Sequence, residues 1–518
     1  MTETLRQRVI KNTAYSVLST LVSRIGGLIF TIIVARILFP EMFGIYSLVL
    51  TIILTLCTFT DLGINSTVIR YLAESLKKKN SKTESQSRSR INFLFNFKIL
   101  LTAAISFALF LLANSIAVYI FKKPVLTTPL QIGAIYLFVM SLQSFLTSIF
   151  YSLQKVNYNA IAEIIFQVLR IVLVLVFFLF YKNVGSVFIS LSIAIFISCI
   201  FLFFILFSKF KFLLKGDKPS LKIEERKRLM SFFGWLSMSS LSLIFFVHID
   251  TFILGVLVSN TAFIGYYQSI FSIVGTGAAF ITFSNFLLPV FTQISKEKLE
   301  RNFKKVLYYL SSIAIPVSIG LAFVIIPAIR FIYGNVYVPT QYHLAITITA
   351  AILSLAVLET ALSSLYYTLF QAKEKPKNPA LVLLFATIAN VILCYVFIKI
   401  GLSISPEYAI IGAAIAVVLT RYANLIVLGI LSKKEFGIGG NISTVLKPIL
   451  ATLVMVAFLI FFNLMIKITV KTLIIEICLA AIIYIVLFLL MGGVKKEDLK
   501  IKYLIRNKNE QIQTKKDI

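Results

Sequence analysis

Histidine, cysteine and acidic side chains are scarce in this chain of 518 residues, and each shortage removes a class of site. There are only two histidines and four cysteines, too few for a Cys/His metal cluster. All four cysteines fall inside long apolar runs, where we expect small buried hydrophobes and no disulfide framework; they are Cys57, Cys199, Cys394 and Cys478. We therefore predict no metal site and no catalytic residues.

A soluble module and large loops are also missing. Hydrophobic residues make up 59% of the chain, and the mean hydropathy of +0.95 excludes a soluble globular protein. The net charge of +29 alone would fit nucleic acid, but no soluble domain carries it, so we expect no nucleic-acid partner. The start of the chain, residues 1–12, lacks a cleavage site and is interpreted as a basic cytoplasmic lead-in.

Long apolar segments dominate what remains. Each reaches the roughly 20 residues that a helix needs to cross a bilayer. We predict an all-α integral membrane protein with fourteen transmembrane helices, at about 8–38, 43–73, 91–121, 129–153, 159–181, 185–208, 229–258, 262–295, 303–332, 343–371, 379–400, 409–431, 446–466 and 472–492.

Lys and Arg are distributed unequally between the two sets of connectors. The N-terminus, every second connector and the C-terminal tail hold 38 of them, with Lys98 counted among these, and the other connectors hold 8. Positive charge accumulates on the cytoplasmic side of membrane proteins. We therefore predict a multi-pass plasma-membrane protein with both termini in the cytoplasm.

The chain repeats itself with a period near 220 residues. Phe43–Tyr46 and Ile264–Tyr267 are 221 residues apart, and similar pairs end the fourth and tenth segments. Because each copy spans six helices, the repeat is parallel, which is typical of transporters with a site between two lobes. The predicted parts are an N-lobe (1–208), a cytoplasmic linker (209–228), a C-lobe (229–432), two extra helices (446–492) and a basic tail (493–518).

Ionisable residues inside the apolar segments require an explanation, because burying a charge in the bilayer costs at least a few kcal/mol. Arginine suits an anionic phosphate because its planar fork donates two hydrogen bonds at once. The candidate substrate-binding residues are Arg24, Arg70, Arg170 and Arg421. The candidates for charge pairing or ion coupling are Asp61, Glu163, His248, Asp250 and Glu359.

Two interpretations of these acids stay open at the level of sequence. They could pair with bases and fix the register of neighbouring helices, or they could bind a coupling cation. Glu163 and Arg170 lie seven residues apart, so they share one helix face. For His248 a polar contact between helices is favoured over a proton relay.

Several motifs, in this order and spacing, resemble one known family. They are Ser23–Gly27 (SRIGG), Ile33–Leu38 (IVARIL), Phe39–Tyr46 (FPEMFGIY), Thr60–Asn65 (TDLGIN), Val68–Glu74 (VIRYLAE), Gln154–Asn157 (QKVN), Ile249–Gly255 (IDTFILG) and Phe370–Pro376 (FQAKEKP). The chain resembles the polysaccharide-type flippases of the multidrug/oligosaccharidyl-lipid/polysaccharide (MOP) exporter superfamily along nearly its whole length. Many relatives have Arg or Lys after the acid of the seventh helix, where this chain has Thr251, which leaves Asp250 freer to bind an ion.

The resemblance implies a MATE-like transporter fold and a flippase for a lipid-linked oligosaccharide. Its substrate would be a polyprenyl (pyro)phosphate sugar made on the cytoplasmic leaflet and moved outward by alternating access. The related lipid II flippases carry an arginine on the first helix in a cationic cavity, which would correspond to Arg24. In those proteins the last two helices form a groove for the lipid tail.

Three alternatives remain. The first is a cation-coupled multidrug exporter of the same superfamily, and the second is an integral-membrane polysaccharide polymerase or glycosyltransferase, which the short connectors disfavour. The third is a non-transporting scaffold for a synthesis complex. For the flippase we expect no cofactor besides a coupling Na⁺ or H⁺. Its partners would be the lipid-linked oligosaccharide, membrane lipids and other polysaccharide-assembly proteins, and we expect it to function as a monomer.

Overall fold

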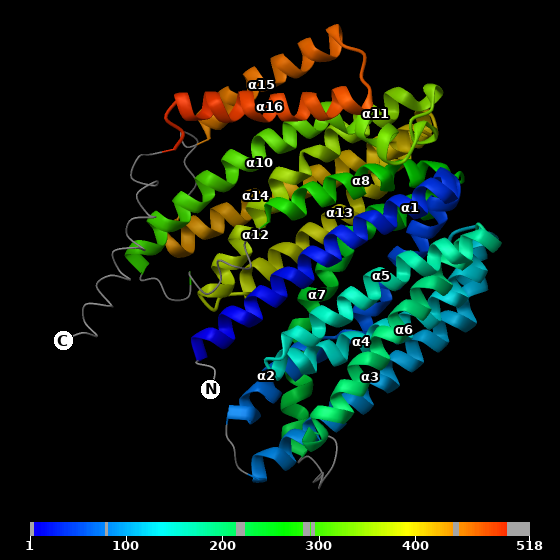
Figure 1. Ribbon diagram of the computed structural model, residues 1–518, viewed down its shortest axis with the longest axis vertical. Helices are drawn as coiled ribbons and strands as arrows, with labels where there is room; N and C mark the ends of the chain where they lie inside the picture. Colours follow the sequence, from blue (N-terminus) through cyan, green and yellow to red (C-terminus); the bar gives the residue numbers. More distant parts are fainter. Residues whose placement is uncertain are drawn as a thin grey trace. The chain divides into compact units, whose positions relative to one another are not determined.

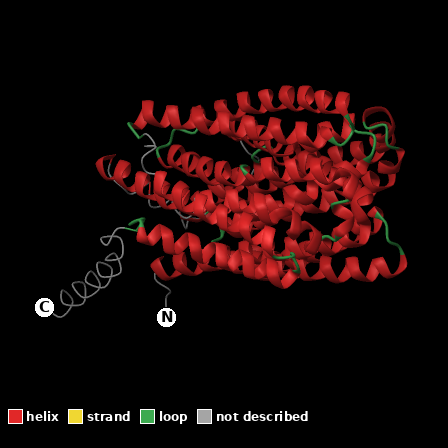
Figure 2. Ribbon diagram, turned by 90° about the horizontal axis from the view of Figure 1, so that it is seen from above, coloured by secondary structure: helices red, strands yellow, loops and turns green. Residues whose placement is uncertain are grey.

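The computed structural model describes residues 5–77, 81–213, 223–282, 291, 296–438 and 445–494. This part of the chain is almost entirely helical and contains no strand (Figure 2). Four predicted features fall partly outside it. These are the lead-in, through residues 1–4, the linker, through 214–222, the second half of the eighth helix, through 283–290 and 292–295, and the basic tail, through 495–518.

The helices follow the predicted segments along the chain (Figure 1). The first half of the chain forms α1 (Leu5–Asp61), α2 (Ile64–Lys77), α3 (Ser81–Ser115), a π-helical turn η1 (Ile116–Ile120), η2 (Pro124–Leu126), α4 (Thr127–Ser152), α5 (Val156–Phe180), α6 (Val184–Lys209) and η3 (Lys211–Leu213). The second half forms α7 (Ile223–Leu257), α8 (Thr261–Ile281), α10 (Lys296–Ile332), η4 (Asn335–Tyr337), η5 (Thr340–Tyr342), α11 (His343–Ser354), α12 (Ala356–Ala372), α13 (Lys377–Ile404), α14 (Tyr408–Phe436), α15 (Leu446–Met465) and α16 (Val470–Leu490).

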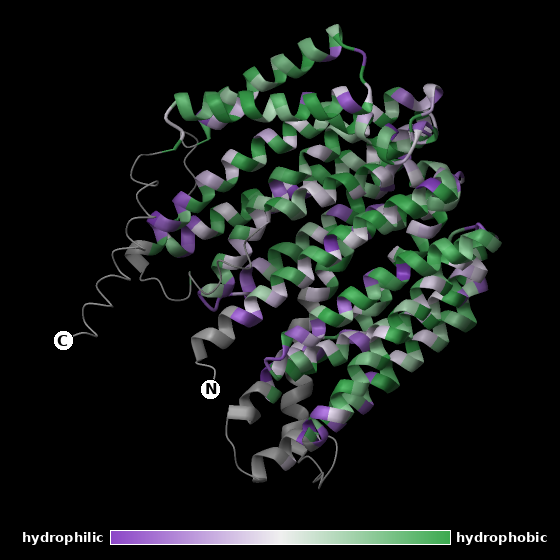
Figure 3. Ribbon diagram, in the orientation of Figure 1, coloured by the Kyte–Doolittle hydropathy of each residue, from purple (hydrophilic) through white to green (hydrophobic). Residues whose placement is uncertain are grey.

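Thirteen helical stretches among the described residues are long and apolar enough to span a membrane. The first, Lys11–Asp61, has 51 residues. A straight helix of that length would measure about 75 Å at 1.5 Å per residue, more than twice the roughly 30 Å of a bilayer core. It is interrupted at Phe39, whose φ of 57° and ψ of 171° are not helical. The stretch therefore contains two crossings, and the fourteen predicted helices are confirmed. The hydropathy colouring shows the apolar character of these helices (Figure 3).

Two predicted helices are broken, which is a correction to the sequence interpretation. The segment 43–73 stops at Asp61 and resumes at Ile64, because Leu62 and Gly63 have φ values of 40° and 78°. The break places Asp61 at a helix end and not in mid-helix. The segment 343–371 is likewise divided into α11 and α12 at Leu355. The carbonyl of Ser354 at that break accepts a hydrogen bond from Ser318 Oγ, at 2.8 Å.

The turns after α4 and α12 have the same construction, 220 residues apart. Gln154 and Glu374 both have a φ of 55°, which side chains other than glycine rarely adopt. The amide of Lys155 donates to the carbonyl of Phe150, and that of Lys375 to Phe370, each at 3.0 Å. Each strained residue is thus held by the same hydrogen bond five residues back, as the internal repeat predicts.

A second sign of the repeat lies where α1 meets α8. A Cβ on Gly44 would stand only 2.0 Å from the carbonyl oxygen of Thr261, and a Cβ on Gly265 only 2.0 Å from that of Pro40. Both pairs of equivalent residues are 221 positions apart. The helices therefore touch backbone to backbone through a reciprocal pair of glycines at equivalent positions of the repeat. Corresponding helices of the repeat also form corresponding pairs, since α1 packs on α5 and α7 packs on α13.

The chain divides into two compact units. One comprises Met1–Thr276, Ile332–Thr349 and Pro376–Asn424, and the other comprises Gly277–Phe331, Ala350–Lys375 and Leu425–Ile518. The division into lobes 1–208 and 229–432 stays a prediction.

Candidate functional site

Arg170 of α5 lies against a glycine face of α1 in the first unit. A Cβ on Gly27 would stand 3.5 Å from Arg170 Nη2. The guanidinium carbon is 4.7 Å from the ring centroid of Phe30 and 5.1 Å from that of Phe166, so aromatic faces hold the cation. Within the described residues, Nε and Nη2 are buried and have no hydrogen-bond partner. The positively charged guanidinium of Arg170 therefore has N–H donors that are not satisfied by the described residues.

Arg24 stands on the same face of α1. It precedes Gly27 by three residues, and residues three apart on a helix are neighbours. It is partly buried, and it already has a contact within the protein. Between the two positions, Gly26 packs so closely on Gln167 that a Cβ there would clash with its side-chain amide. Arg24 and Arg170 thus both lie on the two helices that meet at this contact, α1 and α5, and their binding of substrate stays a prediction.

Glu163, two turns before Arg170 on α5, lines a small polar pocket. Its Oε1 accepts a hydrogen bond from Gln167 Nε2, at 2.6 Å. The pocket has a volume of about 220 Å³, and its polar lining residues are Ser19, Gln143, Ser144, Thr147, Tyr151, Asn159 and Glu163. Asn159 Nδ2 donates to the carbonyl of Thr147 at 3.1 Å, whereas its buried Oδ1 has no donor among the described residues. Oxygen atoms on this wall are therefore available to a small cation.

Asp61 has a partner that the sequence analysis missed. Lys98 of α3 is fully buried, and its Nζ lies 3.5 Å from Asp61 Oδ1. The same oxygen accepts the amide hydrogen of Asn65, at 3.1 Å, and so caps the start of α2. Assigning Lys98 to a connector was wrong, because it lies in the span Arg88–Ile120. The signal was present, since Lys98 falls inside the predicted segment 91–121.

His248, Asp250 and Arg421 form a second group in the first unit, on α7 and α14. The charges of Asp250 and Arg421 both act on His248, and Arg421 lies 5.7 Å from the ring centroid of Phe246. Asp250 is almost fully buried and accepts hydrogen bonds from the amide of Thr251 (2.7 Å) and from Tyr267 Oη (2.5 Å). Thr251 therefore contributes its backbone amide and also its hydroxyl, which donates to the same Asp250 oxygen at 3.4 Å, and both Asp250 oxygens are already in use.

The other two candidates are Arg70, in the first unit, and Glu359, in the second. Arg70 is exposed on α2 and lies over the ring of its neighbour Tyr71, at 5.9 Å. Glu359, at the start of α12, belongs to the second unit, where it is buried and accepts a hydrogen bond from Ser363 Oγ at 2.5 Å. Among the described residues, no three His, Cys, Asp or Glu side chains are grouped so as to hold a metal ion.

An apolar groove runs between α10, α15 and α16 in the second unit. It has a volume of about 380 Å³, and the lining residues include Pro316, Gly320, Met455, Leu459 and Ala481. Its polar residues are already bonded inside the protein. Tyr484 Oη donates to the carbonyl of Ser312 at 2.6 Å, and Ser312 Oγ donates to that of Tyr308 at 2.8 Å. The groove therefore offers its occupant apolar contact, which suits a hydrocarbon chain.

Known structures share the fold of this chain. The lipid II flippase MurJ, in an inward closed conformation, matches with a TM-score of 0.72 at 18% identity, covering 92% of this chain and 98% of that one. An inward-facing multidrug resistance MATE family transporter of the MOP superfamily matches with a TM-score of 0.53 at 15% identity (82% and 96% covered). A MOP superfamily transporter from Pyrococcus furiosus matches with a TM-score of 0.51 at 15% identity (82% and 93% covered). The all-α MOP transporter fold is thereby confirmed.

Sequence families give the second comparison. No curated protein matched the chain. The family model described as polysaccharide biosynthesis protein matches residues 9–295, which is more than half of the 518 residues. With its membrane-spanning helices and its transporter fold, the chain is a multi-pass membrane protein that belongs to the polysaccharide biosynthesis protein family.

Proposed function

We propose that this protein is a flippase that moves a polyprenyl-(pyro)phosphate-linked oligosaccharide from the cytoplasmic to the outer leaflet by alternating access. Such a substrate has two parts with opposite solvation needs. Its diphosphate is anionic, and its polyprenyl chain is apolar. The fold must offer an anion site and an apolar path, and the two units contain one candidate for each.

The observation that carries this proposal is the state of Arg170. Its guanidinium is buried among aromatic rings and has N–H groups without acceptors in the described part of the chain. Leaving a buried charged donor unsatisfied costs free energy that a phosphate oxygen would return. Arg24 on the same helix contact would supply a second cation, and two guanidinium groups can together neutralise the charge of a diphosphate.

The groove of the second unit supports the lipid half of the substrate. Each buried CH₂ group of a hydrocarbon chain contributes about 0.8 kcal/mol. The groove lined by α10, α15 and α16 offers apolar contact to such a chain, because the hydroxyl groups of Tyr484 and Ser312 already donate to carbonyl oxygens of the protein. The helices involved include the two that lie beyond the repeat.

Substitution of Arg24 tests the proposed anion site. Arg24→Ala should abolish export and cause the lipid-linked sugar to accumulate on the cytoplasmic leaflet. Arg24→Lys keeps the charge but loses the two-pronged donor, and should give an intermediate defect. Ile25→Ala, at the exposed neighbouring position, is the matched control and should behave as wild type. Normal export by Arg24→Ala at normal protein level would remove Arg24 from the mechanism.

We further propose that the polar pocket at Glu163 holds the coupling cation, with Na⁺ favoured by its oxygen lining. The Glu163 carboxylate and the unsatisfied Asn159 Oδ1 lie one helical turn apart on α5 and would both contact the ion. Glu163 also interacts electrostatically with Arg170. A cation on Glu163 would weaken that interaction and favour phosphate at Arg170, so the two ligands would help each other to bind.

The coupling proposal is tested by measuring export at fixed pH with and without a Na⁺ gradient. Wild type should respond to the gradient, and Glu163→Gln should not. A response to a proton gradient alone, unchanged in Glu163→Gln, would place coupling elsewhere.

The orientation of the chain remains part of the proposal. We place both termini in the cytoplasm of a plasma-membrane protein, from the charge distribution of the connectors. A reporter that is active only outside the cytoplasm, fused after Ile518, should be silent. Export of cationic drugs in place of the lipid-linked sugar would instead favour the multidrug exporter, and sugar polymerisation by the purified protein would favour the enzyme.

A further inference from the structure

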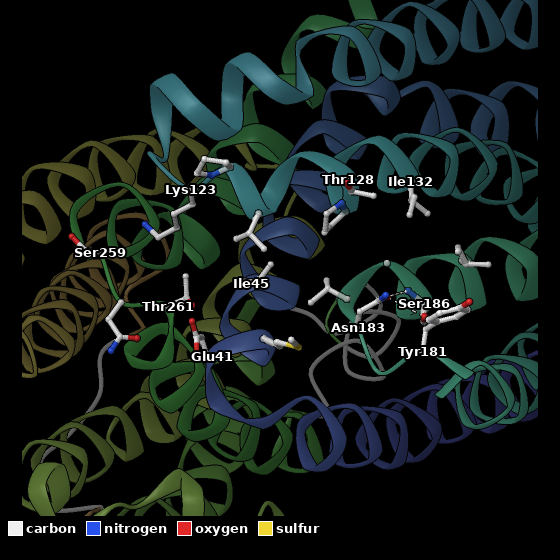
Figure 4. A pocket seen from close by; sticks show the side chains of 18 residues that line it. Glu41, Ile45, Lys123, Thr128, Ile132, Tyr181, Asn183, Ser186, Ser259 and Thr261 are labelled. Carbon is white, nitrogen blue, oxygen red and sulfur yellow. Dashed lines mark hydrogen bonds between the residues drawn. The ribbon is translucent and has the colours of Figure 1, made fainter. Parts of the chain in front are cut away.

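A large pocket opens where four predicted outer connectors meet in the first unit. It has a volume of about 910 Å³, within the usual range of small-molecule sites, roughly 300–1,000 Å³. Its walls come from the connectors between the first and second, third and fourth, fifth and sixth, and seventh and eighth predicted helices. In Figure 4, Glu41, Lys123, Ser259 and Thr261 form one side and Tyr181, Asn183 and Ser186 the other, with Ile45 between them.

Two asparagines present fixed amide donors to this pocket. Asn183 caps α6, where its Oδ1 accepts the amide hydrogen of Ser186 at 2.8 Å, and Asn260 caps α8, where its Oδ1 accepts that of Ala262 at 2.9 Å. The caps use the oxygen of each side chain and leave its NH₂ group without an acceptor in the described part of the chain. Because the caps fix the side chains in place, little conformational entropy is lost when a ligand accepts from them.

The charges in the pocket do not suit an ionic ligand. Lys123, the only cation among the described residues that line the pocket, is buried, and its Nζ donates to the carbonyls of Gly255 (2.6 Å) and Phe121 (3.2 Å). Its role is to fasten the connector after α3 to α7. Glu41 is exposed and can accept two hydrogen bonds, but a single carboxylate is a poor cage for a cation. The chemistry fits a neutral ligand with many hydroxyl groups.

Tyr181 adds an aromatic surface. Its side chain is 70% exposed and lies on the same side of the pocket as Asn183 (Figure 4). A flat ring beside planar amide and carboxylate groups suits a pyranose. The C–H groups on the face of the sugar would pack on the tyrosine ring, and the hydroxyl groups at its edge would bond to the amide and carboxylate groups.

We propose that this pocket is an outer glycan-binding site that takes the sugar part of the translocated lipid as it leaves the protein. The proposal rests on the proposed function and on its orientation, because only then does the pocket face the compartment into which the sugar is delivered. Binding the hydroxyl-rich part there would favour the state in which the substrate has already crossed.

The test uses the full chain in nanodiscs and the oligosaccharide released by mild acid from the host's lipid-linked pool. Saturation-transfer NMR should show binding to wild type. Asn183→Asp and Asn260→Asp keep the capping oxygen and remove the amide donor, so they should fold normally and weaken binding at least about tenfold, the loss of a good hydrogen bond or two. Tyr181→Ala should do the same. Tyr119→Ala, which removes a highly exposed tyrosine outside the lining, is the matched control and should bind as wild type.

A second measurement separates this inference from the proposed function. Ser259→Cys, at an exposed position of the pocket lining, should be labelled by a membrane-impermeant maleimide in intact cells, and the free oligosaccharide should protect it. No oligosaccharide binding at millimolar concentration, or equal binding by all variants, would overturn the glycan site while leaving export by wild type untouched. Labelling only from the cytoplasmic side would overturn the site through its orientation. Absence of export by wild type would instead contradict the proposed function.

Discussion

At the scale of single residues, the charges of this protein are held in three different ways. Arg170 is surrounded by rings and lacks acceptors in the described residues, whereas Asp250 has both oxygens bonded. Lys98 stands between these extremes, because it has a carboxylate at 3.5 Å but no hydrogen-bond partner within the described parts of the chain. The burial of a charged side chain and its bonding partners, and not its charge alone, distinguish a group that is open to a ligand from a group that stabilises the fold.

The Asp61–Lys98 pair should contribute to stability, with an asymmetry between its members. Asp61→Asn keeps the oxygen that caps α2 but leaves Lys98 buried without a counter-charge. Removing one partner of a buried pair costs about 3–5 kcal/mol. Lys98→Met should cost less, because Asp61 is 29% exposed and stays partly hydrated. The double variant should recover most of the loss in a thermal unfolding measurement in detergent. A double variant as unstable as the sum of the single variants would show that the pair is not coupled.

Lys123, which lies outside the membrane-spanning helices, should make the stability of the protein depend on pH. Burial lowers the pKa of its ammonium from 10.5 to about 8. Between these values the unfolded chain binds more protons than the folded one, so the free energy of unfolding rises with pH. The cost of burying the charge is fully present below pH 8 and is lost as the pH approaches 10.5. The melting temperature of wild type relative to Lys123→Met should therefore rise from pH 7 to pH 10. A constant or falling difference would contradict the burial of a charged Lys123.

At the scale of elements, broken helices and glycine contacts shape this fold. The break before α2 and the division between α11 and α12 interrupt segments that hydropathy presents as continuous. Hydropathy reports only the affinity of a segment for lipid, and the break depends on two backbone angles at Leu62 and Gly63. The repeat, in contrast, was predictable, because similar residues recur at a constant spacing and form the same turns.

The glycine contact between α1 and α8 should be sensitive to a single methyl group. Gly265→Ala would place a Cβ against the carbonyl of Pro40, so the two helices must separate. Gly275→Ala, ten residues further along α8, meets nothing within 4 Å and is the matched control. With Thr261→Cys as a reporter, the thiol should be buried in the parent and in Gly275→Ala, and labelled faster in Gly265→Ala. Unchanged labelling in Gly265→Ala would show that this contact does not hold the helices together.

At the scale of the whole molecule, the apolar segments predicted fourteen helices, whereas the transporter fold was predicted from the internal repeat and from the resemblance to the MOP superfamily. Hydropathy alone reveals apolar length, and spacing alone reveals the repeat. The partners of the charged residues could not be predicted, because they depend on which helices lie side by side. Lys98 was misassigned for this reason, and the cap on Asp250 by its own neighbour's amide was not foreseen. Arg24, Glu163 and Arg170 were predictable candidates because a charge in an apolar segment is costly wherever it lies.

The central claim is that this chain transfers a lipid-linked oligosaccharide across a bilayer. The most direct measurement reconstitutes the purified full chain in liposomes carrying a polyprenyl-diphosphate oligosaccharide, and follows the exposure of its sugar to a membrane-impermeant oxidant such as periodate. We predict protein-dependent transfer that is lost in Arg24→Ala and kept in Ile25→Ala. No transfer by wild type under either a Na⁺ or a proton gradient, or transfer by Arg24→Ala at the wild-type rate, would contradict this account.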